Sequence, residues 1–157
     1  MLGRSVQVDR RYEGFAAALA EVGVLPERVI LDSWRINDGR QAGAALAGRA
    51  AAELPTAIMC GNDLIALGLL AEFVHRGIRV PDHVSIVGFD DLSWLEAATI
   101  PLTTVSQPRE ELGRIAVRLL LDEIDHGETH SHRHELLAPE LVIRTSSGGP
   151  RPMHSST

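Results

Sequence analysis

The sequence has little of what marks several classes of protein. Its single cysteine, Cys60, excludes a disulfide within the chain and fits a reducing compartment. No apolar run reaches the length of about 20 residues that a membrane-spanning helix needs, and the first residues show no secretory signal pattern. Basic residues number 15 against 21 acidic ones, which argues against nucleic-acid binding by this chain, because duplex affinity comes mainly from Lys and Arg. These absences predict a cytoplasmic protein that contacts no membrane.

The remaining composition is that of one globular domain, or part of one, with 45% hydrophobic and 23% charged residues in 157. Helical patterns alternate with short apolar runs. Helices are expected from Asp9 to Gly23, from Gly39 to about Glu53, from Asn62 to Gly77 and from Pro108 to Gly127. Strands are expected over 29–34, 56–60, 84–87 and 141–143. This order predicts an α/β fold in which helices flank a parallel sheet. The Ser-, Gly- and Pro-rich end from residue 146 is typical of a disordered tail.

Polar side chains follow two of the expected strands. Asn62 and Asp63 end one apolar run, and Asp90 and Asp91 end another. The carboxyl ends of parallel strands form the crevice in which ligands bind, so these residues are candidates for a site. An Asn donates and accepts hydrogen bonds, while an ionised Asp accepts from two neighbouring hydroxyls, as a polyol presents them. The alternatives are that Asn62 only caps a helix and that Asp90 only lies in a turn.

Other patterns predict no catalytic or metal site. The His-rich stretch over 126–134 contains metal-binding side chains, but alternate residues of a loop do not preorganise a site, and a solvated loop is favoured. Cys60 is interpreted as a small buried strand residue. Consecutive carboxylates such as Asp90 and Asp91 seldom reach one substrate atom, and neither a phosphate-binding loop nor a nucleophile elbow is present. We therefore expect that the chain is not an enzyme and that it binds neither a cofactor nor a metal ion.

Several ordered blocks over residues 7–147 resemble the regulatory half of LacI/GalR-type transcription regulators. They are Pro55-Thr56-Ala57-Ile58, Asn62-Asp63, Ala66-Leu67-Gly68, the run from Gly77 through Val80-Pro81-Asp82 to Gly88-Phe89-Asp90-Asp91, and Pro101-Leu102-Thr103-Thr104-Val105. Blocks in this order are far more specific than any single motif. The resemblance implies part of a periplasmic-binding-protein-like type I fold, whose two α/β subdomains hold a sugar or another small effector between them. It also implies a homodimer that reads operator DNA through a helix-turn-helix headpiece absent from this chain.

The resemblance also implies an effector site, residue by residue. Arg11, Asn62 and Asp90 match effector-contacting positions of the family, Trp34 falls where some members place a ring against the effector, and Gln107 lies at the crossing between subdomains. Each residue has a plainer alternative. Arg11 would be a surface arginine, Trp34 a ring packed at a strand end, and Gln107 a hinge residue. Asp63 and Asp91 are interpreted as capping or loop residues.

Two departures from the family pattern concern the effector class. Gln7 stands where many relatives have a small hydroxyl residue, and Arg109 stands where an aromatic or apolar side chain often follows the crossing. An additional cation would suit an acidic or phosphorylated ligand, although a solvent-facing arginine at a helix start is the more frequent case.

The resemblance divides the chain into parts. Residues 1–147 are expected to be a partial effector-binding domain, with 7–106 and 135–147 in the C-terminal subdomain, 107–134 in the N-terminal subdomain, and 148–157 as a disordered tail. The helix after Pro108 would then lack its partner, and we expect a truncated product that does not fold stably alone. A fragment of a periplasmic sugar-binding protein is the alternative function, and an enzyme is a third, which only the crevice supports.

Overall fold

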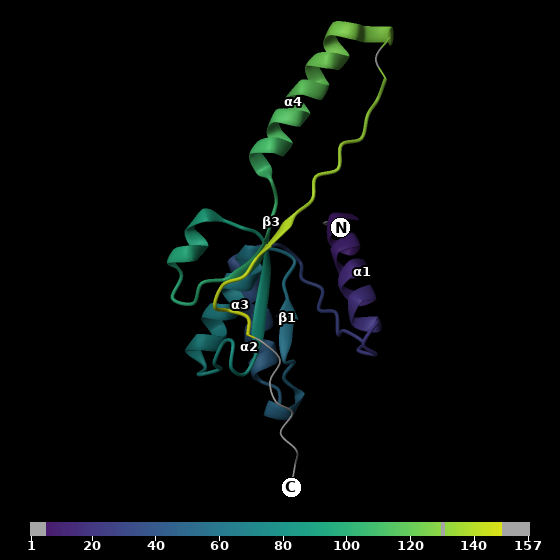
Figure 1. The fold of residues 1–157 in the computed structure, drawn as a ribbon. Coiled ribbons are helices and arrows are strands. Elements are labelled where there is room, and N and C mark those ends of the chain that lie inside the picture. Colours follow the sequence, from purple (N-terminus) through teal and green to yellow (C-terminus); the bar gives the residue numbers. More distant parts are fainter. Residues whose placement is uncertain (1–5, 130, 149–157) are drawn as a thin grey trace.

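A four-stranded sheet forms the centre of the protein in a computed structural model that describes residues 6–129 and 131–148 (Figure 1). The strands are β1 (Ala57–Met59), β2 (Ser85–Asp90), β3 (Thr103–Ser106) and β4 (Glu140–Val142), in the order β1-β2-β3-β4. β1, β2 and β3 run parallel, and β4 pairs antiparallel with β3. The expected α/β architecture is confirmed, with one antiparallel strand at the edge of an otherwise parallel sheet.

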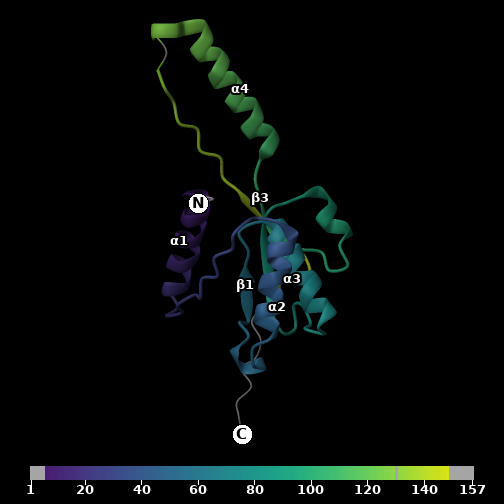
Figure 2. The same ribbon diagram turned by 180° about the vertical axis from the view of Figure 1, so that it is seen from behind.

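The helices are α1 (Val6–Ala20), α2 (Ile36–Ala47), α3 (Asp63–His75) and α4 (Arg109–His126), with short 3₁₀ turns at η1 (Ala51–Glu53), η2 (Ser93–Ala97) and η3 (Gly127–Thr129). α2 and α3 lie together over one face of the sheet (Figure 2). The predicted apolar face of α3 is buried in the core. The core residues are Leu46, Cys60, Ile65, Ala66, Leu69, Leu70, Phe73, Val80, Val84, Ile86, Leu95 and Leu102.

The prediction of a strand over residues 29–34 is wrong. Residues 24–31 have no regular structure and pass between α1 and β1 in both views (Figures 1 and 2). Val29 and Ile30 are more than half exposed, and a β-branched run becomes a strand only when a neighbour accepts its backbone hydrogen bonds. The helix expected up to Glu53 was also too long, since α2 ends at Ala47 and η1 follows as a separate turn.

The chain after β4 belongs to the core and is not the start of a disordered tail. Ser146 is fully buried. Its carbonyl accepts from the Ile86 N–H at 2.8 Å, and its hydroxyl donates to the Ile86 carbonyl at 2.6 Å and accepts from the Thr103 N–H at 2.8 Å. Its side chain and backbone thus satisfy groups of two central strands. The rest of the expected tail, 149–157, lies outside the described residues.

α4 and the returning segment 131–139 project away from the sheet as one arm (Figure 1). Among the α4 residues only Ile115 is buried, while Val117, Leu120 and Ile124 are 57%, 57% and 65% exposed. The arm therefore presents an apolar surface that the described body of the molecule does not cover.

Among the described residues, none of the helices has the length and the apolar character that a membrane span requires.

Candidate functional site

A hollow of about 310 Å³ lies where the carboxyl ends of β1 and β2 meet the first turns of α1. Its lining consists of Gln7, Val8, Arg11, Trp34, Asn62 and Asp90, which we call the candidate site. Four of the five residues predicted from the sequence line this one hollow although they lie far apart in the chain. Its volume is at the lower end of the range for small-ligand pockets.

Arg11 is fixed at one wall of the candidate site. Its Nη1 donates to the Gly61 carbonyl at 2.8 Å, and its guanidinium carbon lies 3.5 Å from the centroid of the Phe89 ring. Partial burial lowers the pKa of Arg11, while the neighbouring carboxylate of Asp90 acts in the opposite direction. The guanidinium nevertheless stays charged at neutral pH. The strand ends thus hold a rigid fork of donors beside the hollow.

Asn62 caps α3 and also lines the hollow. Its Oδ1 accepts from the Ile65 N–H at 2.9 Å, and its Nδ2 donates to the Trp34 carbonyl at 3.2 Å. The cap satisfies one of the free N–H groups at the start of the helix. The second bond ties the Trp34 segment to the strand end. The helix-capping role and a place at the site therefore coexist in one side chain.

Trp34 packs its ring against a glycine. A Cβ added at Gly61 would lie 2.8 Å from Cζ3 of the indole, so a side chain there would displace the ring. The residue remains 36% exposed at the edge of the hollow. An indole at the edge of a hollow can cover an apolar face of a small molecule.

Asp90 is the acidic member of the candidate site. Burial raises its pKa, against the opposing effects of Arg11, of a hydrogen bond from Gln107 and of Arg109. The Gln107 Nε2 donates to Asp90 Oδ1 at 3.0 Å. Gln107 therefore bonds to a lining residue and is not among the lining residues itself.

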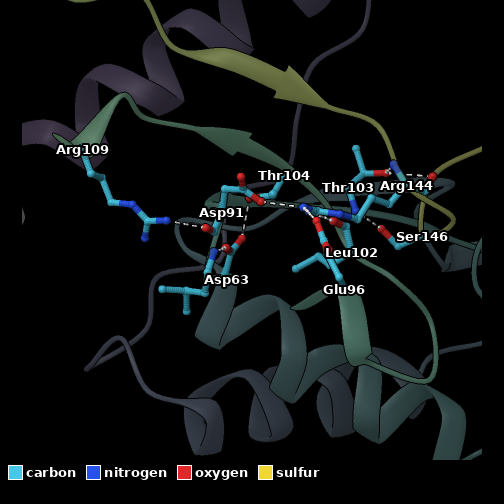
Figure 3. Close-up of polar contacts among 10 residues, drawn as sticks. Asp63, Asp91, Glu96, Leu102, Thr103, Thr104, Arg109, Arg144 and Ser146 are labelled. Carbon is cyan, nitrogen blue, oxygen red and sulfur yellow. Dashed lines mark hydrogen bonds and ion pairs between the residues drawn. The ribbon is translucent and has the colours of Figure 1, made fainter. Parts of the chain in front are cut away.

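Asp63, the residue after Asn62, is buried and links three elements (Figure 3). Its Oδ1 accepts from the Thr104 hydroxyl at 2.6 Å, and its Oδ2 accepts from the Leu92 N–H at 3.0 Å. Burial raises its pKa, and these hydrogen bonds oppose that effect. A Cβ at Gly88 would lie 2.1 Å from Asp63 Oδ1, so glycine makes room for the carboxylate. Asp63 thus joins α3, β3 and the loop after β2.

The structure also shows where the two departures from the family pattern, Cys60 and the histidine-rich stretch lie. Gln7 lines the hollow, whereas the Arg109 Nη2 donates to the Asp91 carbonyl at 2.8 Å. Burial raises the pKa of Cys60 to about 12, so its thiol stays protonated at neutral pH. Within 6–129 and 131–148 no group of three or more His, Cys, Asp or Glu side chains is placed to hold a metal ion, and His130 lies outside these residues.

Sequence reasoning missed some of the lining and its support. Gln7 was noted only as a departure, and Val8 was not noted at all. The Gly61 carbonyl and the Phe89 ring, which fix Arg11, were also missed. Gly61 and Phe89 directly precede the predicted site residues Asn62 and Asp90 at strand ends, and this proximity in the sequence could have identified them.

An α/β domain with a polar hollow at the carboxyl ends of its parallel strands has the form of a small-molecule-binding domain. Residues 2–147 match the family described as periplasmic binding protein-like domain, and the chain belongs to this family.

The chain is 37% identical over 140 residues to the HTH-type transcriptional repressor PurR of Haemophilus influenzae, covering 87% of this chain and 41% of that protein. It is 34% identical over 139 residues to the HTH-type transcriptional repressor CytR of Escherichia coli, covering 87% of this chain and 40% of that protein. A LacI family regulator of Enterococcus faecium, solved with bound ribose, matches with a TM-score of 0.80 and 30% identity over 92% of this chain and 53% of that one.

The chain spans less than half the length of the curated relatives that it matches. It corresponds to the C-terminal effector-binding region of LacI-type regulators, as the ordered motifs predicted. PurR and CytR are transcriptional repressors by name.

Proposed function

We propose that this chain forms one wall of the effector site of a LacI-type transcriptional regulator. Arg11, Trp34, Asn62 and Asp90 are the proposed contacts, and Gln107 acts through its hydrogen bond to Asp90. The observation that carries the proposal is that four residues from distant parts of the sequence line one hollow at the strand ends.

The proposed effector is a neutral, polyhydroxylated molecule such as a sugar. The candidate site combines one guanidinium, one carboxylate, two amides and an indole, so its charges balance. The hydrogen bond from Arg109 to the Asp91 carbonyl gives that cation a protein partner, which does not favour an acidic ligand. Vicinal hydroxyls donate to a carboxylate and accept from a guanidinium, and the indole covers the C–H face of the ring.

The response to the effector, DNA binding and dimerisation are proposed for the whole regulator and not for this chain alone. Effector binding would shift an equilibrium between two arrangements of the cleft. A DNA-binding headpiece outside this chain would respond to that shift by a change in its affinity for operator DNA. The regulator would act as a cytoplasmic homodimer. We assign 7–106 and 135–147 to the C-terminal subdomain and 107–134 to the N-terminal subdomain. The projection of α4 away from the sheet supports this division (Figure 1). We propose no catalytic residue and no cofactor for this chain.

Titration calorimetry of the full-length regulator that contains this chain, with ribose, glucose and other neutral sugars, tests the site. We expect D90A and R11M to weaken the binding of the preferred sugar about tenfold or more, because each removes a charge-assisted hydrogen bond of about 1.5–3 kcal/mol. The matched control is D82A, which removes an exposed carboxylate paired with Arg79 in the loop before β2. Equal heats of binding for wild type and D90A across the panel would contradict the assigned site.

A further inference from the structure

The backbone that carries Asp90 into the candidate site is strained. Asp90 has φ of +117° and Asp91 has φ of +54°, and these two are the non-glycine residues with positive φ in the described chain. Side chains of L-residues rarely adopt this region, and such conformations persist only where the surrounding structure enforces them. The question is therefore which groups hold residues 90 and 91 in place.

Arg144, which follows β4, binds the side chain of Asp91 through its guanidinium (Figure 3). Its Nη2 donates to Asp91 Oδ1 at 2.8 Å, and its Nη1 donates to the Leu102 carbonyl at 2.9 Å. The side chain is only 11% exposed. One rigid fork thus joins the strained loop to the residue before β3.

The base of this fork is itself fixed to the sheet. The Thr103 hydroxyl accepts from the Arg144 N–H at 2.9 Å and lies 3.1 Å from the Arg144 carbonyl, to which it donates. Beyond Asp91, the Leu92 N–H is held by buried Asp63. Arg144 therefore links β3 to the Asp91 side chain, while Arg109 donates to the Asp91 carbonyl and Asp63 fixes the next residue.

We propose that Arg144 is a positioning residue of the candidate site: by holding Asp91 it keeps the backbone of residues 90 and 91 in its strained form and directs the Asp90 carboxylate into the hollow. The inference rests on the proposed function in taking Asp90 as a ligand contact. The claim about geometry can be tested without any ligand.

A simple charge effect predicts a different result from a positioning effect. Burial is the largest influence on the pKa of Asp90, and Arg11, Gln107, Arg109 and Asp63 are the other groups that act on it or face it. If Asp90 moves into solvent, its pKa falls towards the ordinary value. If Arg144 acts only as a nearby positive charge, its removal raises the pKa of Asp90.

The experiment is nuclear magnetic resonance of the 157-residue chain with labelled aspartate carboxyls, in wild type, R144M and R144K. We expect both variants to lose the three-bond couplings that report positive φ at residues 90 and 91, and to lower the pKa of Asp90. R144K keeps the charge but cannot span Asp91 and Leu102 with one planar fork. E96Q is the control, because Glu96 is a 75% exposed second partner of Arg144 at 3.3 Å and should leave the couplings unchanged.

Retention of the positive-φ couplings in both variants would overturn the proposal, as would a raised pKa of Asp90 in R144M with no change in R144K. If R144M fails to fold, R144K decides between the outcomes. Failure of the sugar titrations would remove the proposed ligand contact but would leave this measurement of loop geometry standing, so the two ideas fail separately.

Discussion

Asp63 and Asp90 end up in different environments at neighbouring strand ends, and the difference sets their roles. Asp63 is fully buried and accepts from Thr104 and from the Leu92 N–H. Asp90 is partly exposed, lines the hollow and accepts from Gln107. The same residue type thus stabilises the fold at one position and is the proposed ligand contact at the other.

Replacing Asp63 with Asn should destabilise the protein by about 1–3 kcal/mol, the usual result of leaving a buried donor unsatisfied. An Asn has one acceptor oxygen, so its NH₂ group would face either the Thr104 hydroxyl or the Leu92 N–H. Urea unfolding followed by circular dichroism measures the change. D82N, in an exposed ion pair with Arg79, is the matched control and should change the free energy of unfolding by less than about 0.5 kcal/mol. Equal stability of D63N and wild type would contradict the structural role.

The raised pKa of Asp63 also predicts a pH dependence of stability. Because burial raises the pKa of Asp63 above its ordinary value of 3.8, the folded state binds a proton more tightly than the unfolded chain does. The contribution of this group to stability is therefore greatest below pH 3.8 and is lost as the pH rises through the folded-state pKa. The free energy of unfolding of wild type minus that of D63N should fall across this window. The subtraction separates Asp63 from Asp91, because the latter has a lowered pKa and acts in the opposite direction.

The residues of the candidate site were predictable only where a side chain carries the recognition. Arg11, Trp34, Asn62 and Asp90 were predicted from their match to effector-contacting positions of the family, and the structure brings all four to one hollow. The Gly61 carbonyl could not be predicted in this way, because every residue has a backbone carbonyl and only the fold decides which one faces Arg11.

At the scale of elements, glycine permits the close contact between α2 and α3. A Cβ added at Gly68 would lie 1.9 Å from the Ile36 carbonyl oxygen, which is backbone and cannot move aside easily. We expect G68A to destabilise the protein by about 1–3 kcal/mol through overpacking.

G113A provides the opposite result in a matched substitution. Gly113 is inside α4, and nothing lies within 4 Å of an added Cβ. Alanine should stabilise this helix by about 0.5–1 kcal/mol, because glycine loses more backbone entropy on folding. Thermal unfolding of both variants beside wild type tests the pair. A loss of stability in G113A, or none in G68A, would contradict the close α2–α3 contact at Gly68 and the open space around Gly113.

The sequence predicted elements well where periodicity and pairing agree. α3 was expected from Asn62 and an apolar face, and the cap and the face are both present. The run over 29–34 has strand-forming residues, but among the described residues no strand of the sheet pairs with it, and local patterns do not reveal that lack. Ser146 was assigned to a tail from its composition, whereas its position is decided by distant partners on β2 and before β3.

At the scale of the whole molecule, the arm formed by α4 and residues 131–139 differs in burial from the body. The α2–α3 layer covers its apolar side chains with the sheet, whereas most of the large apolar side chains of α4 face solvent. Exposed apolar surface on this scale promotes association between molecules. The arm is therefore expected to govern the solution behaviour of the chain more than its stability.

Placing a charge on the arm should reduce self-association without weakening the fold. Leu120 is 57% exposed and Ile124 is 65% exposed, so L120K and I124K remove apolar surface that contributes little to the core. E123Q is the matched control, because it also raises the net charge by one but leaves the apolar face intact. Sedimentation velocity over a range of concentrations should show less association for L120K and I124K than for wild type and E123Q, with free energies of unfolding within about 0.5 kcal/mol of one another. If all four proteins associate equally, or if both lysine variants unfold, the apolar side chains of α4 are buried in solution and the arm does not project as described.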